Sequence, residues 1–320
     1  MTISSRSLYR NWRPVTVEEM KGFIAVVLNM GIGQLTNLKD YWSTDDTTNF
    51  PFFRSVFSRD RFFQIFGMLY VGDPDGTTKR SKIQPLLDRL CPVFGATFTP
   101  DRQIAVDESV INFKGRVSFR QYLKGKPHPW GIKAFVLSDS KTGYLQRVCV
   151  YYGRETQLID NDNPHTVRVV QTLVEPFHNR GYDLYVDRFY TSPLLASELM
   201  KVGITVTGTV QSNRRGMPKE VTDKRKKEPR GNIRAARSGN ILALSWLDKR
   251  KVLMLSTKHN ASTTQVRTRY TIINSISDHR LAIYYNTQYH VYLPLFFCPG
   301  VEKSQTSPQL LPTTTNSCWG

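Results

Sequence analysis

The sequence has few cysteines and lacks the motifs of several common sites. Its four cysteines are scattered without a C-x-x-C pair, so neither a disulfide framework nor a zinc cage is predicted. The six histidines show no H-x-x-x-H or mixed Cys/His spacing. The sequence also contains no G-x-x-x-x-G-K-[ST] and no G-x-S-x-G motif. We therefore expect no P-loop, no ATP as a partner and no nucleophile elbow.

Long hydrophobic runs are missing as well. The longest apolar stretches, Gly22–Leu28 and Val291–Cys298, fall far below the ~18–20 residues that span a bilayer. The N-terminus has no apolar run typical of a signal peptide. These features predict an intracellular protein with reduced cysteines and no membrane partner.

Acidic residues are scarce relative to basic ones. The chain has 44 Lys+Arg against 26 Asp+Glu, a net charge of +18, which favours nucleic acid as a partner ahead of a membrane surface. Residues 213–269 alone hold 16 basic and 4 acidic residues, a net +12. This block includes a cluster suited to phosphate contact or nuclear import, or alternatively to a solvated loop without a specific role: Lys224, Arg225, Lys226 and Lys227. We expect the protein in the nucleus.

Amphipathic helices predict a helical domain over residues 1–100. Thr16 and Glu19 form a capping box before apolar residues at helical spacing: Met20, Phe23, Ile24, Val27 and Leu28. Ser58 precedes a second helix with an apolar face made of Phe62, Phe63, Phe66 and Leu69. A third apolar set consists of Ile83, Leu86, Leu87 and Leu90. We interpret these stripes as core.

Residues 101–213 predict an α/β domain instead. Five segments have strand patterns: Ile104–Asp107, Ile132–Ser138, Tyr144–Tyr152, Tyr182–Asp187 and Ile204–Val210. Two helices separate the last three strands, one carrying Val167, Val170 and Val174 and the other spanning Leu194–Val202. This order predicts a mixed five-stranded sheet with flanking helices, in which the fourth strand lies parallel beside the first. Ribonuclease-H-like nucleases use this arrangement.

Two aspartates are the candidate catalytic residues. Asp107 and Asp187 each end a predicted strand, and in this topology the two ends meet at one edge of the sheet. Close carboxylates favour a hard divalent cation, Mg²⁺ or Mn²⁺. Two such ions about 3.5–4 Å apart can support phosphodiester cleavage. The alternative is that each aspartate only ends a strand, with Asp187 capping the next helix.

A stretch after Asp107 alternates aromatic and basic residues. The aromatic residues are Phe113, Phe119, Tyr122 and Trp130. The basic residues are Lys114, Arg116, Arg120, Lys124, Lys126 and Lys133. Aromatic rings stack on unpaired bases and cations follow the phosphate backbone, so this pattern indicates a DNA contact. An exposed hairpin with ordinary surface charge is the alternative.

Several sequence blocks resemble the piggyBac transposase family. Asp101–Arg116, followed by FRQY at 119–122 and WGIK at 130–133, is similar to its first catalytic block. YVDRFYTS at 185–192, with GTV at 208–210 and NRRGMP at 213–218, is similar to the second. DYWS at 40–43 and SRDRF at 58–62 fit the helical region that precedes the core. Together the blocks cover roughly residues 12–260.

The resemblance implies a ribonuclease-H-like core with three metal-binding aspartates, Mg²⁺ or Mn²⁺ as cofactor, and DNA and a second copy of the chain as partners. The family cuts and rejoins DNA at transposon ends, through hairpin intermediates and TTAA targets. Asp107 and Asp187 match its first and second aspartates. The insertion that interrupts the family's core corresponds to residues 214–269, and its DNA contacts would include Arg214 and Arg215.

The family's third aspartate is not reproduced in this sequence. Tyr284-Tyr285-Asn286 resembles one fragment of the expected block, but no Gly-Gly-Val-Asp follows, and Asp278 reads better as a helix cap than as a substitute ligand. Residues 270–320 read as a divergent, poorly ordered tail. We therefore predict a transposase-derived DNA-binding protein with impaired strand cleavage. Two alternatives are an active transposase or nuclease with an unidentified third carboxylate, and a non-functional truncated fragment.

Overall fold

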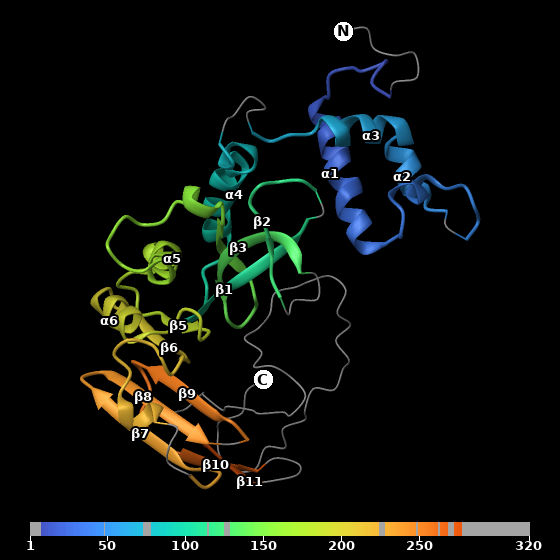
Figure 1. The fold of residues 1–320 in the computed structure, drawn as a ribbon. Helices are drawn as coiled ribbons and strands as arrows, with labels where there is room; N and C mark the ends of the chain where they lie inside the picture. Colours follow the sequence, from blue (N-terminus) through green and yellow to red (C-terminus); the bar gives the residue numbers. More distant parts are fainter. Residues whose placement is uncertain are drawn as a thin grey trace. The chain divides into compact units, whose positions relative to one another are not determined.

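A computed structural model describes residues 8–47, 49–72, 78–113, 115–124, 129–223, 228–247, 249–261, 263–267 and 272–276. The chain divides into two compact units, each described by itself below. The first contains the helices before residue 77, and the second contains the sheet and everything that packs on it (Figure 1). Within the described residues, no helix is long and apolar enough to cross a membrane.

The first unit consists of short helices with sequence-encoded starts: α1 (Val17–Ile32), the 3-10 helix η1 (Leu38–Trp42), α2 (Pro51–Val56) and α3 (Arg59–Met68). The predicted capping box is confirmed, since Thr16 accepts the backbone N–H of Glu19 and Glu19 accepts that of Thr16. Ser58 likewise caps α3 by accepting the N–H of Arg61.

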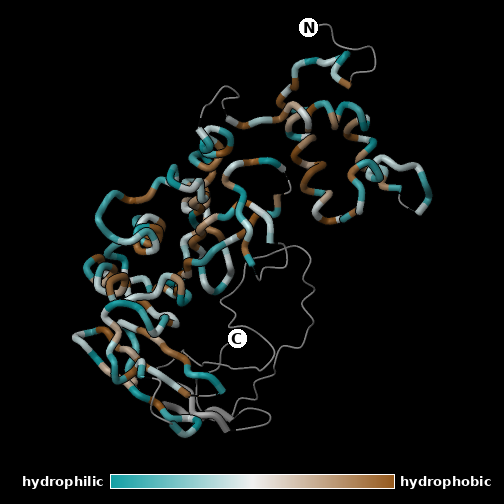
Figure 2. Tube along the Cα trace, viewed as in Figure 1, coloured by the Kyte–Doolittle hydropathy of each residue, from teal (hydrophilic) through white to brown (hydrophobic). Residues whose placement is uncertain are grey.

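Aromatic residues fill the core of this unit. Its buried residues are Phe23, Val26, Tyr41, Trp42, Phe53, Phe57, Phe62 and Ile65. The predicted stripe on α1 is only partly right: Phe23 is buried, but Ile24, Val27 and Leu28 are 52%, 44% and 67% exposed. In this small unit, α2 and α3 cover only one narrow face of α1. In Figure 2 much of α1 is brown, the colour of hydrophobic residues.

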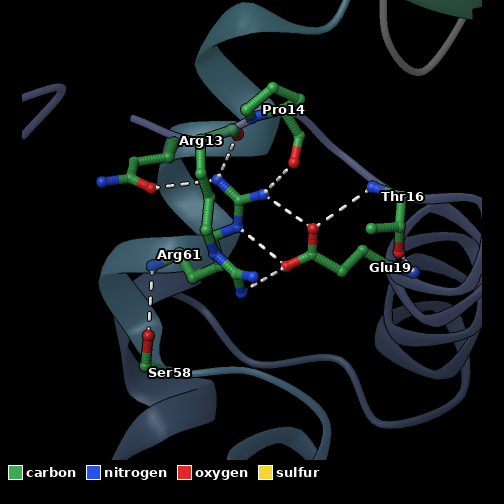
Figure 3. A network of polar contacts seen from close by, with 7 residues as sticks. Arg13, Pro14, Thr16, Glu19, Ser58 and Arg61 are labelled. Atoms are coloured by element: carbon green, nitrogen blue, oxygen red, sulfur yellow. Dashed lines mark hydrogen bonds and ion pairs between the residues drawn. The ribbon is translucent and has the colours of Figure 1, made fainter. Parts of the chain in front are cut away.

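An ion pair joins the start of α1 to α3 (Figure 3). The Arg61 guanidinium donates to both carboxylate oxygens of Glu19, at 3.0 and 2.7 Å, and to the carbonyl oxygens of Arg13 and Pro14. Only 9% of the Arg61 side chain is exposed, and Gln64 accepts a further N–H from it. The chain leading into α1 is therefore tied to α3 through one guanidinium.

A nine-stranded mixed sheet organises the second unit. Its strands are β1 (Gln103–Asn112), β2 (Arg120–Tyr122), β3 (Trp130–Asp139), β4 (Leu145–Val150), β5 (Asp183–Val186), β6 (Thr205–Thr209), β7 (Ile233–Ser238), β8 (Ile241–Leu247) and β9 (Lys251–Ser256). Their order is β2-β3-β1-β5-β6-β9-β8-β7, and β4 also pairs with β3. β5 pairs parallel with β1 and with β6, while β3 pairs antiparallel with β1 and β4. The five predicted strands and the parallel placement of the fourth beside the first are confirmed.

The first strand is longer than predicted. β1 runs to Asn112 because it stays paired with β3 through Ser109–Ala134 and beyond, after β5 has ended. Asp107 therefore lies inside a strand and does not end one, which corrects the sequence analysis. β2, a three-residue edge strand, was not predicted.

Helices cover both faces of the sheet. One face carries α5 (His165–Val174) and α6 (Pro193–Lys201), whose buried residues pack with Ile104 and Val106 of β1. On the other face Leu87 of α4 (Gln84–Thr97) packs with the cluster that contains Val136. The sequence analysis had assigned α4 to the helical region, yet it packs on β4. Among the described residues after α3 there are also three 3-10 helices and one short α-helix: η2 (Arg80–Lys82), η3 (Gly153–Glu155), η4 (Glu175–Phe177) and α7 (Lys219–Thr222).

The basic insertion extends the sheet. β7, β8 and β9 form an antiparallel meander, and β9 pairs antiparallel with β6 through Thr207–Ser256, Gly208–Leu255 and Thr209–Met254. A separate two-stranded pairing joins β10 (Thr263–Arg267) and β11 (Ile272–Ile276). Asp278 and residues 284–286 lie outside the described residues, as does most of the predicted tail.

Candidate active site

Asp107 of β1 lies at the same level as Asp187, the residue that follows the neighbouring parallel strand β5. Val106 of β1 is in register with Val186 of β5, and each aspartate is the next residue along its chain. Adjacent strands are about 4.8 Å apart, so the backbones carrying the two carboxylates are close neighbours. The two aspartates therefore lie side by side, as the sequence analysis required, although β1 continues past Asp107 and the pair does not share a common strand end.

A hydrogen-bonded turn holds Asp187. Its carboxylate accepts the N–H of Phe189 at 2.7 Å, and its carbonyl oxygen accepts the Thr191 hydroxyl at 2.7 Å. The cap of α6 is Ser192, which accepts the N–H of Leu195. Asp187 therefore shapes the turn before α6 but does not cap that helix. The helix-cap alternative for Asp187 is thereby set aside.

A glycine lets this turn pack closely on the sheet. Gly208 of β6 lies so near the carbonyl oxygen of Val186 and the hydroxyl of Thr191 that a Cβ atom would overlap both. The backbone immediately before Asp187 is therefore fixed by a contact that only glycine permits.

Several carboxylates surround a buried phenol beside the two strands. Tyr190 is fully buried, and burial, followed by the negative charges of Glu108, Asp107 and Asp187, raises its pKa. Burial also raises the pKa of Asp187, against the opposing hydrogen bond from Phe189, and Glu108 raises it further. The site is thus a partly buried concentration of negative charge, in which a cation would be stabilised.

Glu108 is balanced by a lysine. Lys133 of β3 lies 3.5 Å from the Glu108 carboxylate, with its ammonium 4.8 Å from the Phe135 ring centre and 5.2 Å from that of Phe189. Its side chain is only 15% exposed. Burial, and next the charge of Lys133, lowers the pKa of His165. Lys133 was predicted to contact DNA, and the structure places it among these groups.

The two aspartates have the chemistry of a Mg²⁺ or Mn²⁺ site. Magnesium is commonly held by one or two carboxylates, with waters and substrate phosphates as the other ligands, and this donor set fits that description. In the part of the chain that the structure describes, no three Asp, Glu, His or Cys side chains are grouped so as to hold a metal together. Water and substrate oxygens could complete a site built from Asp107 and Asp187.

The other predicted DNA contacts are distributed over two regions. Arg214 donates to the carbonyl oxygens of Arg188 and Phe189, which ties the start of the insertion to the turn after Asp187. Arg120 is half-buried. The exposed predicted contacts are Arg116, Lys124 and Arg215. The remaining ones lie outside the described residues: Lys114, Lys126 and Lys224–Lys227.

Sequence reasoning missed Glu108 and Tyr190 as members of the site. Glu108 follows Asp107 directly, and strand alternation places it on the opposite face, next to Lys133. Tyr190 reads as an ordinary residue of a turn. A signal was available for Glu108, because it shares a face of β1 with the buried Ile104 and Val106, and an acidic residue on such a face needs a partner.

Three comparisons with known proteins agree with one another. A family model described as "Transposase IS4" matches residues 2–292. The human PiggyBac transposable element-derived protein 3 is 25% identical over 251 residues, covering 76% of this chain and 42% of that protein. The human PiggyBac transposable element-derived protein 2 is 26% identical over 259 residues, with the same coverage of each chain. The chain thus spans less than half the length of these relatives.

The fold is also similar to a solved structure, described as a cryo-EM structure of a piggyBac transposase synaptic complex with hairpin DNA. The TM-score is 0.72 at 25% identity, covering 82% of this chain and 55% of that one.

Proposed function

The chain belongs to the piggyBac transposase family, and we propose that it is a DNA-binding protein derived from such a transposase, with impaired strand cleavage. Its core would be ribonuclease-H-like, with DNA as its partner. The observation that carries this proposal is the placement of Asp107 and Asp187 one residue beyond the Val106–Val186 register pair of two parallel strands. Carboxylates in this position suit metal-dependent phosphodiester chemistry.

Charge supports the DNA partner. The net charge of +18 is concentrated in the insertion, and the related solved structure is described as a complex with DNA. Arg214 connects that insertion to the turn of Asp187 through two backbone carbonyl groups. DNA held by the insertion would therefore be held by a segment bonded directly to the candidate site.

Asp107 and Asp187 would hold Mg²⁺ or Mn²⁺, which when bound would activate a nucleophile and stabilise the leaving oxygen. The chain's own residues fix the geometry: the hydrogen bonds from Phe189 and Thr191 orient the Asp187 turn, and Tyr190 of the same turn is buried in the core cluster that contains Val106 and Val186. The missing third aspartate is the reason to expect impaired chemistry, because a misplacement of about 1 Å can lower a rate on the order of 10²-fold.

The test uses the full chain, labelled DNA with a TTAA-flanked transposon end, and Mn²⁺. We expect salt-dependent binding with little or no nicking, and Mn²⁺ binding, followed by electron paramagnetic resonance, that weakens in Asp107→Ala and Asp187→Ala. Asp101→Ala is the matched control, since its exposed carboxylate lies at the start of the same strand region. Absence of DNA binding would refute the proposal.

Two other outcomes would favour the alternatives. Efficient nicking that both Asp107→Ala and Asp187→Ala abolish would indicate an active enzyme with a third carboxylate still to be identified. Unfolding without cooperativity would indicate a non-functional fragment.

Nuclear localisation and a homodimer are proposed as well. Lys224–Lys227 is a sequence suited to import, and a fluorescent fusion should lose nuclear accumulation when the four residues are neutralised. Five aliphatic side chains of α1 are exposed, as expected of a surface that another chain covers: Val17, Ile24, Val27, Leu28 and Ile32. Light scattering after size-exclusion chromatography measures the mass of the protein in solution, which distinguishes a dimer from a monomer.

A further inference from the structure

The structure separates the four aromatic residues that follow Asp107 into two kinds. Phe119 is 4% exposed, and its ring centre lies 5.1 Å from that of Tyr152. Phe113 packs against the core cluster that contains both of these residues. Tyr122 and Trp130, in contrast, are 56% and 49% exposed. A role in the core therefore explains why Phe113 and Phe119 are aromatic. It does not explain the exposed rings of Tyr122 and Trp130.

The exposed pair forms an organised surface. Tyr122 and Trp130 lie directly opposite each other on β2 and β3, with ring centres 5.0 Å apart. The guanidinium of Arg120 lies 4.7 Å from the Trp130 ring centre and donates to the carbonyl oxygen of Gly115 at 3.2 Å. The Leu123 N–H donates to the Pro129 carbonyl oxygen at 2.7 Å, which closes the ladder behind the rings. Rings and cation are thus held on a hydrogen-bonded base.

We infer that Tyr122, Trp130 and Arg120 form a stacking platform for an unpaired nucleobase of the bound DNA. This inference rests on the proposed function, because it names the kind of DNA that the core recognises. Exposed aromatic rings beside cations bind bases by their faces and are tolerant of sequence. Arg116 and Lys124, both exposed, flank the platform in the sequence and supply the positive charge that a phosphate backbone requires.

The platform lies on the face of the sheet toward which Asp107 points. Along β3, Trp130 and Ile132 alternate onto the same face as Val136, which is paired with Asp107. Val136 lies six positions after Trp130, a distance of about 20 Å along the strand. That length corresponds to about six base steps of B-form DNA. The base that stacks on the platform therefore does not lie at the position of Asp107. It is several nucleotides away, along the DNA, from the phosphate nearest to Asp107.

The test compares two probes of the same sequence by fluorescence anisotropy: a fully paired duplex, and a duplex with a short single-stranded thymine overhang that carries 2-aminopurine. We expect the wild-type chain to prefer the overhang and to quench 2-aminopurine. Trp130→Ala and Tyr122→Ala should each weaken overhang binding by about 5- to 100-fold. The affinity for the paired duplex should change less than about 2-fold, since phosphate contacts remain. Trp130→Phe and Tyr122→Phe keep a ring and should retain most of the preference.

Tyr70→Ala is the matched control, because Tyr70 is a 62% exposed tyrosine of the first unit. Equal losses on both probes, or an unchanged preference in Trp130→Ala, would overturn the platform while leaving the proposed function intact. A wild-type chain that binds neither probe would refute the proposed function itself. If Trp130→Ala only converts dimers to monomers, the rings form a protein interface and the inference is wrong.

Discussion

Replacing Glu19 by Gln should destabilise the first unit through Arg61. The change removes the carboxylate that receives two hydrogen bonds from the Arg61 guanidinium and one from the exposed guanidinium of Arg13. It leaves the Arg61 side chain, which is only 9% exposed, with neutral partners. Breaking a buried ion pair costs about 3–5 kcal/mol, whereas an exposed pair contributes about 0–1 kcal/mol. The Glu19 side chain is 15% exposed, so an intermediate loss of about 2 kcal/mol is expected.

Hydrogen–deuterium exchange measured on peptides of α1 and α3 is the suitable assay, since it reports on this unit alone. A loss of about 2 kcal/mol should accelerate exchange by about 30-fold. Glu18→Gln removes the same charge from the same helical turn, but from an exposed side chain, and should cost at most about 1 kcal/mol. The double variant Glu19→Gln, Arg61→Met should lose less unfolding free energy than the two single variants lose together, as expected for a coupled pair.

The effect should also depend on pH. The hydrogen bond from Arg61 lowers the pKa of Glu19 below its ordinary 4.5, so the ionised carboxylate stabilises the folded unit above that value. This stabilisation is lost as the pH falls through the lowered pKa of Glu19. The difference in the free energy of unfolding between wild type and Glu19→Gln should therefore become smaller in that pH range. This reasoning would be refuted if the difference in unfolding free energy between wild type and Glu19→Gln stayed constant from neutral to acidic pH. It would also be refuted if Glu18→Gln destabilised the unit as much as Glu19→Gln.

Three further predictions concern the second unit. Gly208→Ala should lower the stability of this unit by about 1–3 kcal/mol in thermal unfolding, because the new Cβ would overlap the Val186 carbonyl oxygen. Gly95→Ala in α4 of the same unit, where the new Cβ would meet only the Gln146 side chain at 4.0 Å, should not lower it. Asp183→Asn should cost about 2 kcal/mol in urea unfolding, because the buried carboxylate pairs with Lys258; an unchanged midpoint would contradict this. Neutralising Lys224–Lys227 should flatten the salt dependence of DNA binding, by about 0.9 in slope for each phosphate that the protein no longer neutralises, and an unchanged slope would mean that other residues hold the phosphates.

Local signals were sufficient for much of the fold. Thr16 and Ser58 mark their helix starts because a capping side chain bonds within three residues of itself. Strand alternation similarly identifies the five core strands, and the crossover rule places β5 beside β1.

Non-local pairing accounts for what the sequence did not reveal. β1 continues past Asp107 because β3 supplies partners there, and β9 joins β6 across some fifty residues of chain. In the candidate site, the neighbourhood of Glu108, Lys133 and Tyr190 depends on three separate segments. Whether Phe119 or Trp130 is exposed likewise depends on what packs over each ring, which alternation alone does not specify.

The pairing of β9 with β6 has a consequence for engineering this chain. A truncated version lacking the meander would strip the backbone partners Ser256, Leu255 and Met254 from β6. The amides and carbonyls so uncovered would form an unpaired edge along β6, a template for strands of other molecules. Excising the insertion to test its role should therefore yield polymers, and point substitutions of its arginines and lysines are the sounder route.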